Sequence, residues 1–156
     1  MLNELPGGLA TSPAPADAQR VLAGWWSRVA AFLIDWLVLI VAIVLIEAIA
    51  RVVQSTVVIV VLFVGWAFAA LIGYWVYFEG SASGQTPGKH ALGIRVRGVG
   101  GGRASYGQAL GRNLLRDLMA IFWPVGIANY LWPLWDRKNQ CLHDKAASTI
   151  VVRYTP

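Results

Sequence analysis

The chain has 156 residues, of which 57% are hydrophobic and 13% are charged, and its formal net charge is +5. Because a soluble domain carries about 25% charged residues, this composition argues against a soluble fold and predicts a surface that largely faces lipid. The basic residues flank apolar segments and form no aromatic-basic or zinc-ligand pattern, so we expect anionic lipid headgroups as partners and no nucleic acid. The single cysteine excludes an internal disulfide.

The N-terminal region, residues 1–23, is rich in proline, alanine and glycine and lacks the apolar run that a signal sequence needs. A segment of this composition is typical of a disordered tail. We therefore expect a disordered segment over residues 1–23 and one membrane domain over residues 24–153.

Two apolar runs, residues 29–50 and 56–78, predict two full transmembrane helices. The first has 22 residues, which at about 1.5 Å per residue gives roughly 33 Å, enough to cross a hydrocarbon core of about 30 Å. It contains two acids, Asp35 and Glu47, whereas the second run contains no charged residue. The linker between the runs is so short that the second helix must turn straight back.

A third apolar segment, residues 118–135 within a broken region of about 114–135, has two interpretations. Pro124, Gly126 and Pro133 interrupt it, so it does not predict one straight helix. If it enters the membrane, breaks at residues 124–126 and returns, 12 of the 13 basic residues lie on one side. The positive-inside tendency favours this re-entrant arrangement, with both termini in the cytoplasm and the chain in the plasma or inner membrane. The alternative is one kinked full crossing.

Two short runs rich in β-branched residues, 92–96 and 149–152, predict strands, and the glycine-rich residues 98–102 suit a turn. In the re-entrant arrangement both strands lie on the cytoplasmic side, where they can pair. The predicted fold class is therefore an all-α membrane bundle with two full transmembrane helices. A broken third segment, re-entrant or kinked, and a small cytoplasmic β element complete it.

Four blocks in the sequence resemble the RDD family of membrane proteins and follow that family's order: WSRVAAFLID at 26–35, GQTPGK at 84–89, GIRV at 93–96 and LHDKAASTIVV at 142–152. The family is named for one arginine and two aspartates. The resemblance places these at Arg28, Asp35 and Asp144, with Asp117 as an alternative for the second aspartate. It implies a membrane fold but leaves the activity open, because ligand transport is only proposed for the family and some members are linked to sodium/proton exchange.

Asp35 is the most informative candidate residue. It lies roughly 9 Å into the first predicted helix, where a charged side chain costs about 2.5 to 3.5 kcal/mol on insertion scales. Arg112 and Arg116 are four residues apart and share a helix face, so we expect one of them to reach Asp35. The result is either an ion or proton site or, as we favour, a buried ion pair that locks the helices. Arg28 lies on the same helix face as Asp35 but two turns away, so we expect its guanidinium to extend toward the membrane surface and not to pair with Asp35.

Glu47 lies near the far end of the first predicted helix, roughly 120° around the helix from Asp35. The two acids therefore do not form one site on a straight helix. We favour an interfacial glutamate beside Arg51, and the alternative is a second acid at another depth of an ion path.

The GQTPGK block lacks the first glycine and the final Ser or Thr of a phosphate loop. It therefore predicts a tight cytoplasmic turn, with Lys89 near lipid phosphates. Asp144 is expected to accept hydrogen bonds from backbone amides, or from Arg95 or Lys89 across the strand pair. The neighbouring His143 has a side chain that titrates near neutral pH in water.

Two classes of function follow. The histidine and cysteine content offers no catalytic triad or zinc-ligand spacing, so we expect no enzyme, metal or cofactor. The first class is ion- or proton-coupled transport, of the sodium/proton-exchange kind that the resemblance implies, with a monovalent cation or a proton as ligand. So small a bundle would need a homo-oligomer for transport. The second class is a non-transporting accessory or assembly subunit of a larger membrane complex.

Overall fold

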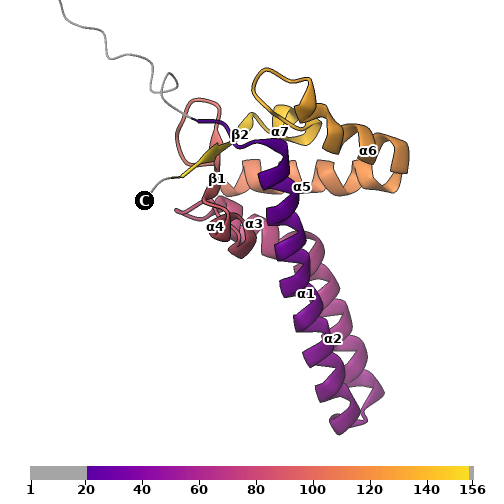
Figure 1. The fold of residues 1–156 in the computed structure, drawn as a ribbon. Coiled ribbons are helices and arrows are strands. Elements are labelled where there is room, and N and C mark those ends of the chain that lie inside the picture. The colour runs from indigo at the N-terminus through magenta and orange to yellow at the C-terminus, as the bar shows by residue number, and fades with distance from the viewer. Residues whose placement is uncertain (1–20, 155–156) are drawn as a thin grey trace, which may run out of the picture.

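Two long antiparallel helices dominate the structure, a computed structural model that describes residues 21–154 (Figure 1). The first helix ends at Val53 and is followed by Gln54, whose left-handed backbone (φ 52°) turns the chain back toward the second helix. The second helix is continuous over Thr56–Gly80, although a π-helical turn interrupts its hydrogen-bond pattern. Both predicted spans are confirmed as helices: α1 (Trp25–Val53), then α2 (Thr56–Phe68), the π-helical turn η1 (Ala69–Gly73) and α3 (Tyr74–Gly80).

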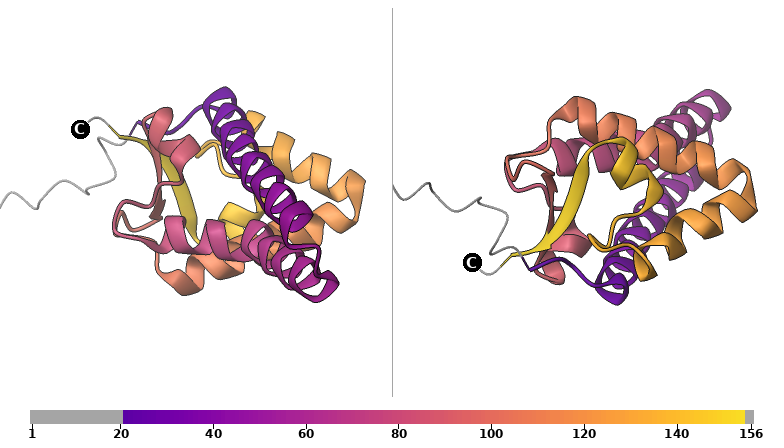
Figure 2. Two further views of the ribbon diagram at one scale, coloured as in Figure 1. Left: turned by 90° about the horizontal axis from the view of Figure 1, so that it is seen from below. Right: turned by 90° about the horizontal axis from the view of Figure 1, so that it is seen from above.

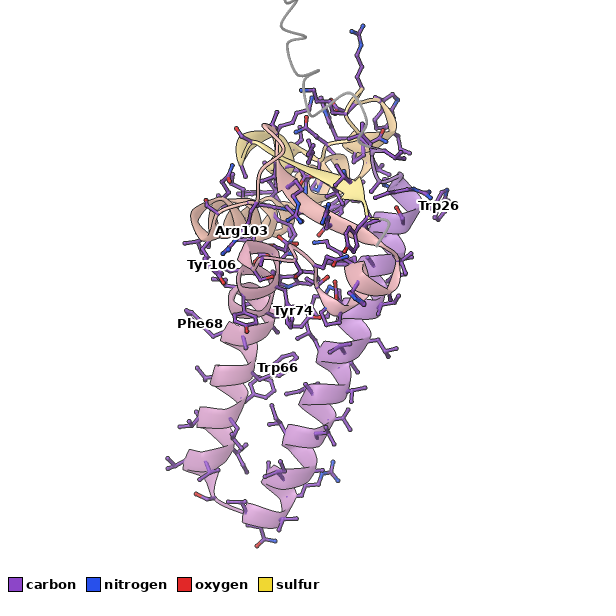
Figure 3. The ribbon with its side chains drawn as sticks, turned by 90° about the vertical axis from the view of Figure 1, so that its left-hand side faces the viewer. Trp26, Trp66, Phe68, Tyr74, Arg103 and Tyr106 are labelled. Carbon is purple, nitrogen blue, oxygen red and sulfur yellow. The ribbon has the colours of Figure 1, made fainter. Side chains whose placement is uncertain are left out.

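The surface of these two helices is apolar. Both are long and apolar enough to cross a bilayer, yet only 17% of the most apolar stretch of α1 and 6% of that of Thr56–Gly80 are buried. Figure 3 shows their side chains pointing outward along most of their length. The core helix of a soluble protein would be mostly buried, and an exposed apolar surface of this size marks a contact with membrane or protein.

A few contacts hold the two helices together. The indole Nε1 of Trp66 donates a hydrogen bond to the backbone oxygen of Leu39 at 3.2 Å, and Figure 3 shows this side chain directed toward α1. Closer to the rest of the chain, Leu39 packs with the buried side chains of Ala70 and Trp75. The pair is therefore best packed at the end where it meets the remaining elements.

The remaining elements form a head at one end of the helix pair (Figure 1). Two antiparallel strands pair there, from Ile94 opposite Arg153 to Gly98 opposite Thr149, which confirms the predicted strand pair. The first strand begins two residues later than predicted, because Gly93, with a left-handed φ of 59°, ends the preceding short helix. The head elements are α4 (Pro87–Ala91), β1 (Ile94–Gly98), α5 (Tyr106–Ile121), α6 (Trp123–Leu131), η2 (Trp132–Leu134), α7 (Leu142–Ala146) and β2 (Thr149–Arg153).

The chain before α1 lies along the free edge of β2. Leu22 forms a bridge with Val152, and the backbone nitrogen of Ala23 donates to the oxygen of Val151 at 2.9 Å. Ala23 and Val151 are buried in a small apolar core together with residues of β1. Most of the predicted disordered tail, residues 1–20, lies outside the described residues.

The third apolar segment forms a helical hairpin. Helices α5 and α6 lie side by side and run across the axis of the two long helices (Figures 1 and 2). The chain reverses at Phe122, whose backbone (φ −96°, ψ 88°) is not helical. The break was predicted at residues 124–126 and occurs earlier, because Pro124 lies in the first turn of α6, where its missing N–H costs nothing.

Helix α5 is amphipathic in the opposite sense to a helix in water. Its buried face carries polar side chains, among them Arg112, Asn113 and Arg116. Its exposed face carries an apolar stripe at helical spacing, with side chains 40% to 74% exposed: Leu110, Leu114, Leu118 and Ile121. A helix on the surface of a soluble protein buries its apolar face, so this stripe suits an apolar environment such as lipid acyl chains.

Candidate functional site

Five charged side chains from five different helices meet in the interior of the head. Four of them are less than 10% exposed, and the fifth, on α1, is 11% exposed. They form one continuous chain of alternating charge, which we call the charge network: Arg28, Asp144, Arg112, Glu79 and Lys89.

Asp144 is the anion between two guanidinium groups. Nη1 of Arg28 donates to its Oδ2 at 2.7 Å, and Nε of Arg112 lies 3.1 Å from its Oδ1. The backbone nitrogen of Cys141 also donates to Oδ2, at 3.2 Å, so Asp144 caps the start of α7. Burial alone would raise the pKa of Asp144, but Arg112 and then Arg28 hold it below its usual range.

The expected side-chain partners of Asp144 were wrong. It contacts neither Arg95, which stacks on the ring of Tyr154 at 4.3 Å, nor Lys89, which pairs with Glu79. The reason is that Asp144 lies in the first turn of a helix and points into the head, not onto the strand pair. The predicted bond from a backbone amide is confirmed by the Cys141 nitrogen.

Glu79 is the second anion of the network, and sequence reasoning missed it. It is 1% exposed, pairs with Lys89 and lies 3.4 Å from Nη1 of Arg112 through its Oε2. Asn113 Nδ2 donates to the same oxygen at 3.1 Å. The position of Glu79 directly after an uncharged membrane-length run was the available signal. Lys89 is buried in this pair, so the expectation that it contacts lipid phosphates was also wrong.

Asp35 is fully buried and accepts hydrogen bonds from three uncharged donors. These are the hydroxyl of Tyr74 at 2.8 Å, the hydroxyl of Thr86 at 2.6 Å and the backbone nitrogen of Gly88 at 2.7 Å. The predicted ion pair with Arg112 or Arg116 is wrong, because Arg112 faces the charge network and Arg116 faces elsewhere.

The GQTPGK block brings these donors to Asp35. Thr86 caps α4 by accepting from the nitrogen of Lys89 at 3.3 Å, so the amides at the start of α4 point toward α1. A Cβ atom at Gly88 would lie 2.1 Å from the backbone oxygen of Ala31, so only glycine permits this approach. The GQTPGK block therefore binds the carboxylate of Asp35, where a phosphate loop would bind the phosphate of a ligand.

Arg116 lies beside the π-helical turn. Its Nε donates to Asp117 at 2.9 Å and its Nη2 to the backbone oxygen of Leu71 at 3.3 Å. Its guanidinium stacks over Trp75 at 4.6 Å, and the indole of Trp75 donates to the oxygen of Ala70 at 2.9 Å. The side chains thus use carbonyl groups of the turn as acceptors, which binds α5 to the second long helix.

Glu47 lies away from the head, near the far end of α1. Its carboxylate accepts a hydrogen bond from Arg51 at 2.9 Å, and both side chains are exposed, at 63% and 79%. The expected position of Glu47 beside Arg51 is confirmed, and its location at the membrane interface stays a prediction.

His143 and Cys141 border Asp144. The ring Nδ1 of His143 lies 2.9 Å from Oδ1 of Asn129, and burial lowers the pKa of this histidine. Ligand atoms of Cys141, His143 and Asp144 lie within 4.8 Å of one another. However, both oxygens of Asp144 are already paired with guanidinium groups, and burial raises the pKa of the Cys141 thiol. This trio therefore does not fit a metal ion.

A cavity of about 310 Å³ reaches from the surface of α1 to the charge network, and we call it the head cavity. Its wall combines aliphatic and aromatic side chains with charged ones, and α1 contributes to both kinds. The charged residues in the wall are Arg28, Asp35, Glu79, Lys89, Arg112 and Arg116, and the aromatic ones are Trp25, Phe32, Trp75 and Tyr130.

Two membrane-length apolar helices carrying a head with an inverted amphipathic helix define a membrane protein. The chain belongs to the RDD family, whose family profile it matches over residues 22–148. The resemblance read from the sequence blocks is thereby confirmed. No curated protein and no solved structure matches the chain. Of the two candidates for the second aspartate, Asp144 contacts Arg28, whereas Asp117 pairs with Arg116.

Proposed function

We propose that this protein carries out ion- or proton-coupled transport as a homo-oligomer, and that Asp35 is the residue that binds the monovalent cation or the proton. The observation that carries the proposal is the surroundings of Asp35. Its carboxylate is fully buried within a membrane-length helix and is held by uncharged donors only. Ionisable groups in such positions mark ion and proton pathways in membrane proteins.

The chemistry of the surroundings suits a change of charge at Asp35. A proton or a sodium ion arriving there neutralises the carboxylate without first breaking an ion pair. The hydroxyl oxygens of Tyr74 and Thr86 lie within hydrogen-bond distance of the carboxylate. They are also hard ligands of the type that small cations prefer.

The proposal also gives Asp35 a route to the charge network. Asp35 holds the start of α4 through Thr86 and Gly88, and the next residue, Lys89, pairs with Glu79. A change of charge at Asp35 therefore alters the position of α4 and, with it, a cation of the network. This coupling of two packed groups through a short helix is the kind of contact that an exchange cycle requires.

An oligomer is part of the proposal because two helices cannot enclose a path across a bilayer. The apolar faces of α1 and of Thr56–Gly80 are largely exposed in the single chain. In the proposed orientation the head lies in the cytoplasm, since Arg51 is the only described basic residue at the opposite end of the helix pair. The chain then acts as a transport protein and not as an enzyme.

The second candidate function is a non-transporting accessory or assembly subunit. The observation that favours it is the mutual pairing of the network residues within one chain, from Arg28 to Lys89. Such pairing also suits a purely structural lock of the head. In that case the exposed faces of the long helices would contact partner proteins.

Flux measurements decide between the two candidates. Purified protein is reconstituted into liposomes, and sodium and proton movement are recorded under imposed sodium and pH gradients. Transport predicts flux above that of protein-free liposomes. Asp35→Asn should abolish this flux, while Glu47→Gln, an acid-to-amide change on the same helix away from the head, should retain it. Absence of flux in the unaltered protein under either gradient would favour the accessory role, and flux in Asp35→Asn would remove Asp35 from the mechanism.

A further inference from the structure

We infer that the head cavity binds the anionic group of an amphiphile, namely a phosphate or carboxylate attached to an apolar chain that reaches the cavity from the bilayer. This inference concerns a ligand site at Arg28 and Arg112, not the cation or proton at Asp35. It is independent of whether the protein transports anything.

The charged part of the cavity wall has an excess of positive charge, with four basic side chains and two acidic ones, Asp35 and Glu79. Nη2 of Arg28 is buried and has no hydrogen-bond partner. Nε and Nη1 of Arg112, like Oδ1 of Asp144, form no well-aligned hydrogen bond, but their ionic contacts at 3.1 Å and 3.4 Å already pair Arg112 with Asp144 and Glu79. The donor without a partner is therefore Nη2 of Arg28, and Arg112 adds positive charge beside it. Both arginines line the cavity. Buried donors are normally satisfied, and a guanidinium group is suited to a bidentate contact with phosphate or carboxylate.

The apolar part of the cavity wall includes residues of α1, a helix long and apolar enough to cross a bilayer. Val29, Phe32 and Leu33 form this part of the wall, and Leu33 is 62% exposed on the helix surface. Across from them stands Tyr130 of α6, whose backbone oxygen accepts a hydrogen bond from the indole of Trp25 at 2.8 Å. If α1 crosses the bilayer, the cavity therefore opens toward lipid near the headgroup layer.

These two parts of the wall together favour an amphiphile over a dissolved anion. Inorganic phosphate would satisfy the arginines but would leave the apolar wall in contact with water. A chain attached to the anionic group would cover that wall and gain the free energy of removing apolar surface from water. A volume of about 310 Å³ suits a headgroup anion with the first part of its chain, while the rest of the chain extends along α1.

The only cysteine of the chain provides the readout. Cys141 lines the cavity beside the two arginines, so a bound ligand should shield its thiol. The full chain in a neutral detergent is treated with an excess of N-ethylmaleimide at one fixed alkaline pH, because burial raises the pKa of this thiol and slows its reaction. The rate of Cys141 modification without any addition is the reference, and it is followed by mass spectrometry. The additions compared are phosphatidylglycerol, oleate, phosphatidylcholine and inorganic phosphate. A ligand present at tenfold its dissociation constant should slow modification about tenfold, because about nine-tenths of the sites are then occupied.

We expect protection by phosphatidylglycerol or oleate, and none by phosphatidylcholine or inorganic phosphate at the same concentration. Protection by phosphatidylglycerol alone assigns the site to a phospholipid, and protection by oleate alone assigns it to a free amphiphilic anion. Equal protection by phosphatidylcholine would overturn the inference, because the charge would then play no part. Equal protection by inorganic phosphate would contradict the need for an apolar chain on the ligand. Absence of protection by every addition would contradict the existence of a ligand site in the cavity.

Two matched pairs of variants localise the effect. Leu33→Trp places a larger side chain in the cavity wall and narrows the cavity. Leu37→Trp makes the same change one turn further along α1, at a residue that is similarly exposed but does not line the cavity. Arg28→Lys keeps the positive charge but removes the unpartnered Nη2, and Arg51→Lys is its control far from the head. Protection should weaken in the first member of each pair only. Equal behaviour within both pairs would contradict the inference, and the Leu33→Trp result decides if Arg28→Lys fails to fold.

Binding is measured at equilibrium and without a gradient, so its outcome is separate from the flux experiment. A protein that binds the amphiphile but shows no flux would keep this inference and lose the proposed transport. A protein that shows flux but does not bind the amphiphile would support transport at Asp35 and contradict the ligand site at Arg28.

Discussion

Nη1 of Arg28 lies 2.7 Å from Oδ2 of Asp144, although 116 residues separate them in the chain. This pair joins the first turns of α1 to the start of α7, and β2 follows α7 after a short turn. Because the chain before α1 also pairs with β2, the two ends of the described chain close on each other around the head.

Replacement of Asp144 by alanine tests the importance of this closure. Asp144→Ala leaves Arg28 and Arg112 as buried cations without their shared anion, and breaking a buried pair in this way costs about 3 to 5 kcal/mol. We expect a lower melting temperature in detergent and faster amide exchange in residues 149–153 and 94–98, since β2 follows α7 directly. Glu47→Ala, which breaks an exposed pair, should leave both quantities nearly unchanged. Unchanged exchange in both strands of Asp144→Ala would show that the head does not depend on this carboxylate.

Gly88→Ala tests the approach of α4 to α1. The added methyl group would lie 2.1 Å from the backbone oxygen of Ala31, so α4 must move away and Asp35 loses its hydrogen bond from the Gly88 nitrogen. We expect a destabilisation of about 1 to 3 kcal/mol, as for a buried acceptor that loses its donor. The matched control is Gly111→Ala in α5, where the new Cβ meets no atom within 4 Å. That change should stabilise the protein by about 0.5 to 1 kcal/mol. Similar effects of the two changes on thermal unfolding would argue against a close contact at Gly88.

The pH dependence of stability should report on His143. Burial lowers the pKa of His143 in the folded state, whereas in the unfolded chain it lies near 6.5. As the pH falls through about 6.5, the unfolded chain takes up a proton that the folded chain does not, so stability decreases, by about 2 kcal/mol at pH 5. Asp144 adds nothing in this range. Its lowered folded pKa gives stability that is complete above about pH 4 and is lost only in stronger acid.

Variants of the two histidines isolate this effect. His143→Gln keeps an amide donor for Asn129 and should flatten the stability profile between pH 7 and pH 5, measured as the free energy of unfolding in detergent. His90→Gln, at an exposed position, is the control and should leave the slope as it is. A slope that persists in His143→Gln would assign the proton uptake to another group.

The sequence was sufficient to predict elements whose signal is local. The two long helices follow from uninterrupted apolar runs, and the strands from runs of β-branched residues. The fold-back of the third segment followed from its prolines and from the distribution of basic residues. Its turn was placed too late, because a proline was read as the end of one helix when it begins the next.

The partners of the charged residues were mostly not predictable from the sequence, for a physical reason. The charge network takes one residue from each of five helices, and its choice of pairs depends on how all five pack. Asp35 was expected to need a cation because it is buried. It is satisfied by the start of a short helix instead, which only the approach of Gly88 to α1 makes possible. Glu47 was predicted correctly because its partner lies four residues away.

The apolar stripe of α5 predicts that this helix lies against lipid. In a Cys141→Ala background, Leu118→Cys places a thiol on the stripe, and Ser105→Cys places one on the exposed residue that caps the helix. In liposomes we expect a membrane-impermeant maleimide to modify position 105 but not position 118. After solubilisation in detergent, a small permeant maleimide should modify both positions. Rapid labelling of position 118 in intact liposomes would place the stripe in water and contradict its contact with lipid.

The hairpin of α5 and α6 leads to a prediction about the orientation of the chain in the membrane. If α5 and α6 return to the side from which they start, the C-terminus lies with the head, and the positive-inside tendency places both in the cytoplasm. A reporter fused after Pro156 should then be active as a cytoplasmic protein. A reporter inserted between Gln54 and Ser55, where α1 turns into α2, should report the opposite side of the membrane. Adding basic residues at this turn should weaken the preference for the head on the cytoplasmic side, because Arg51 is the only described basic residue at that end of the helix pair. A C-terminal reporter on the outer side would contradict this arrangement, in which α5 and α6 pack side by side and return the chain to the head.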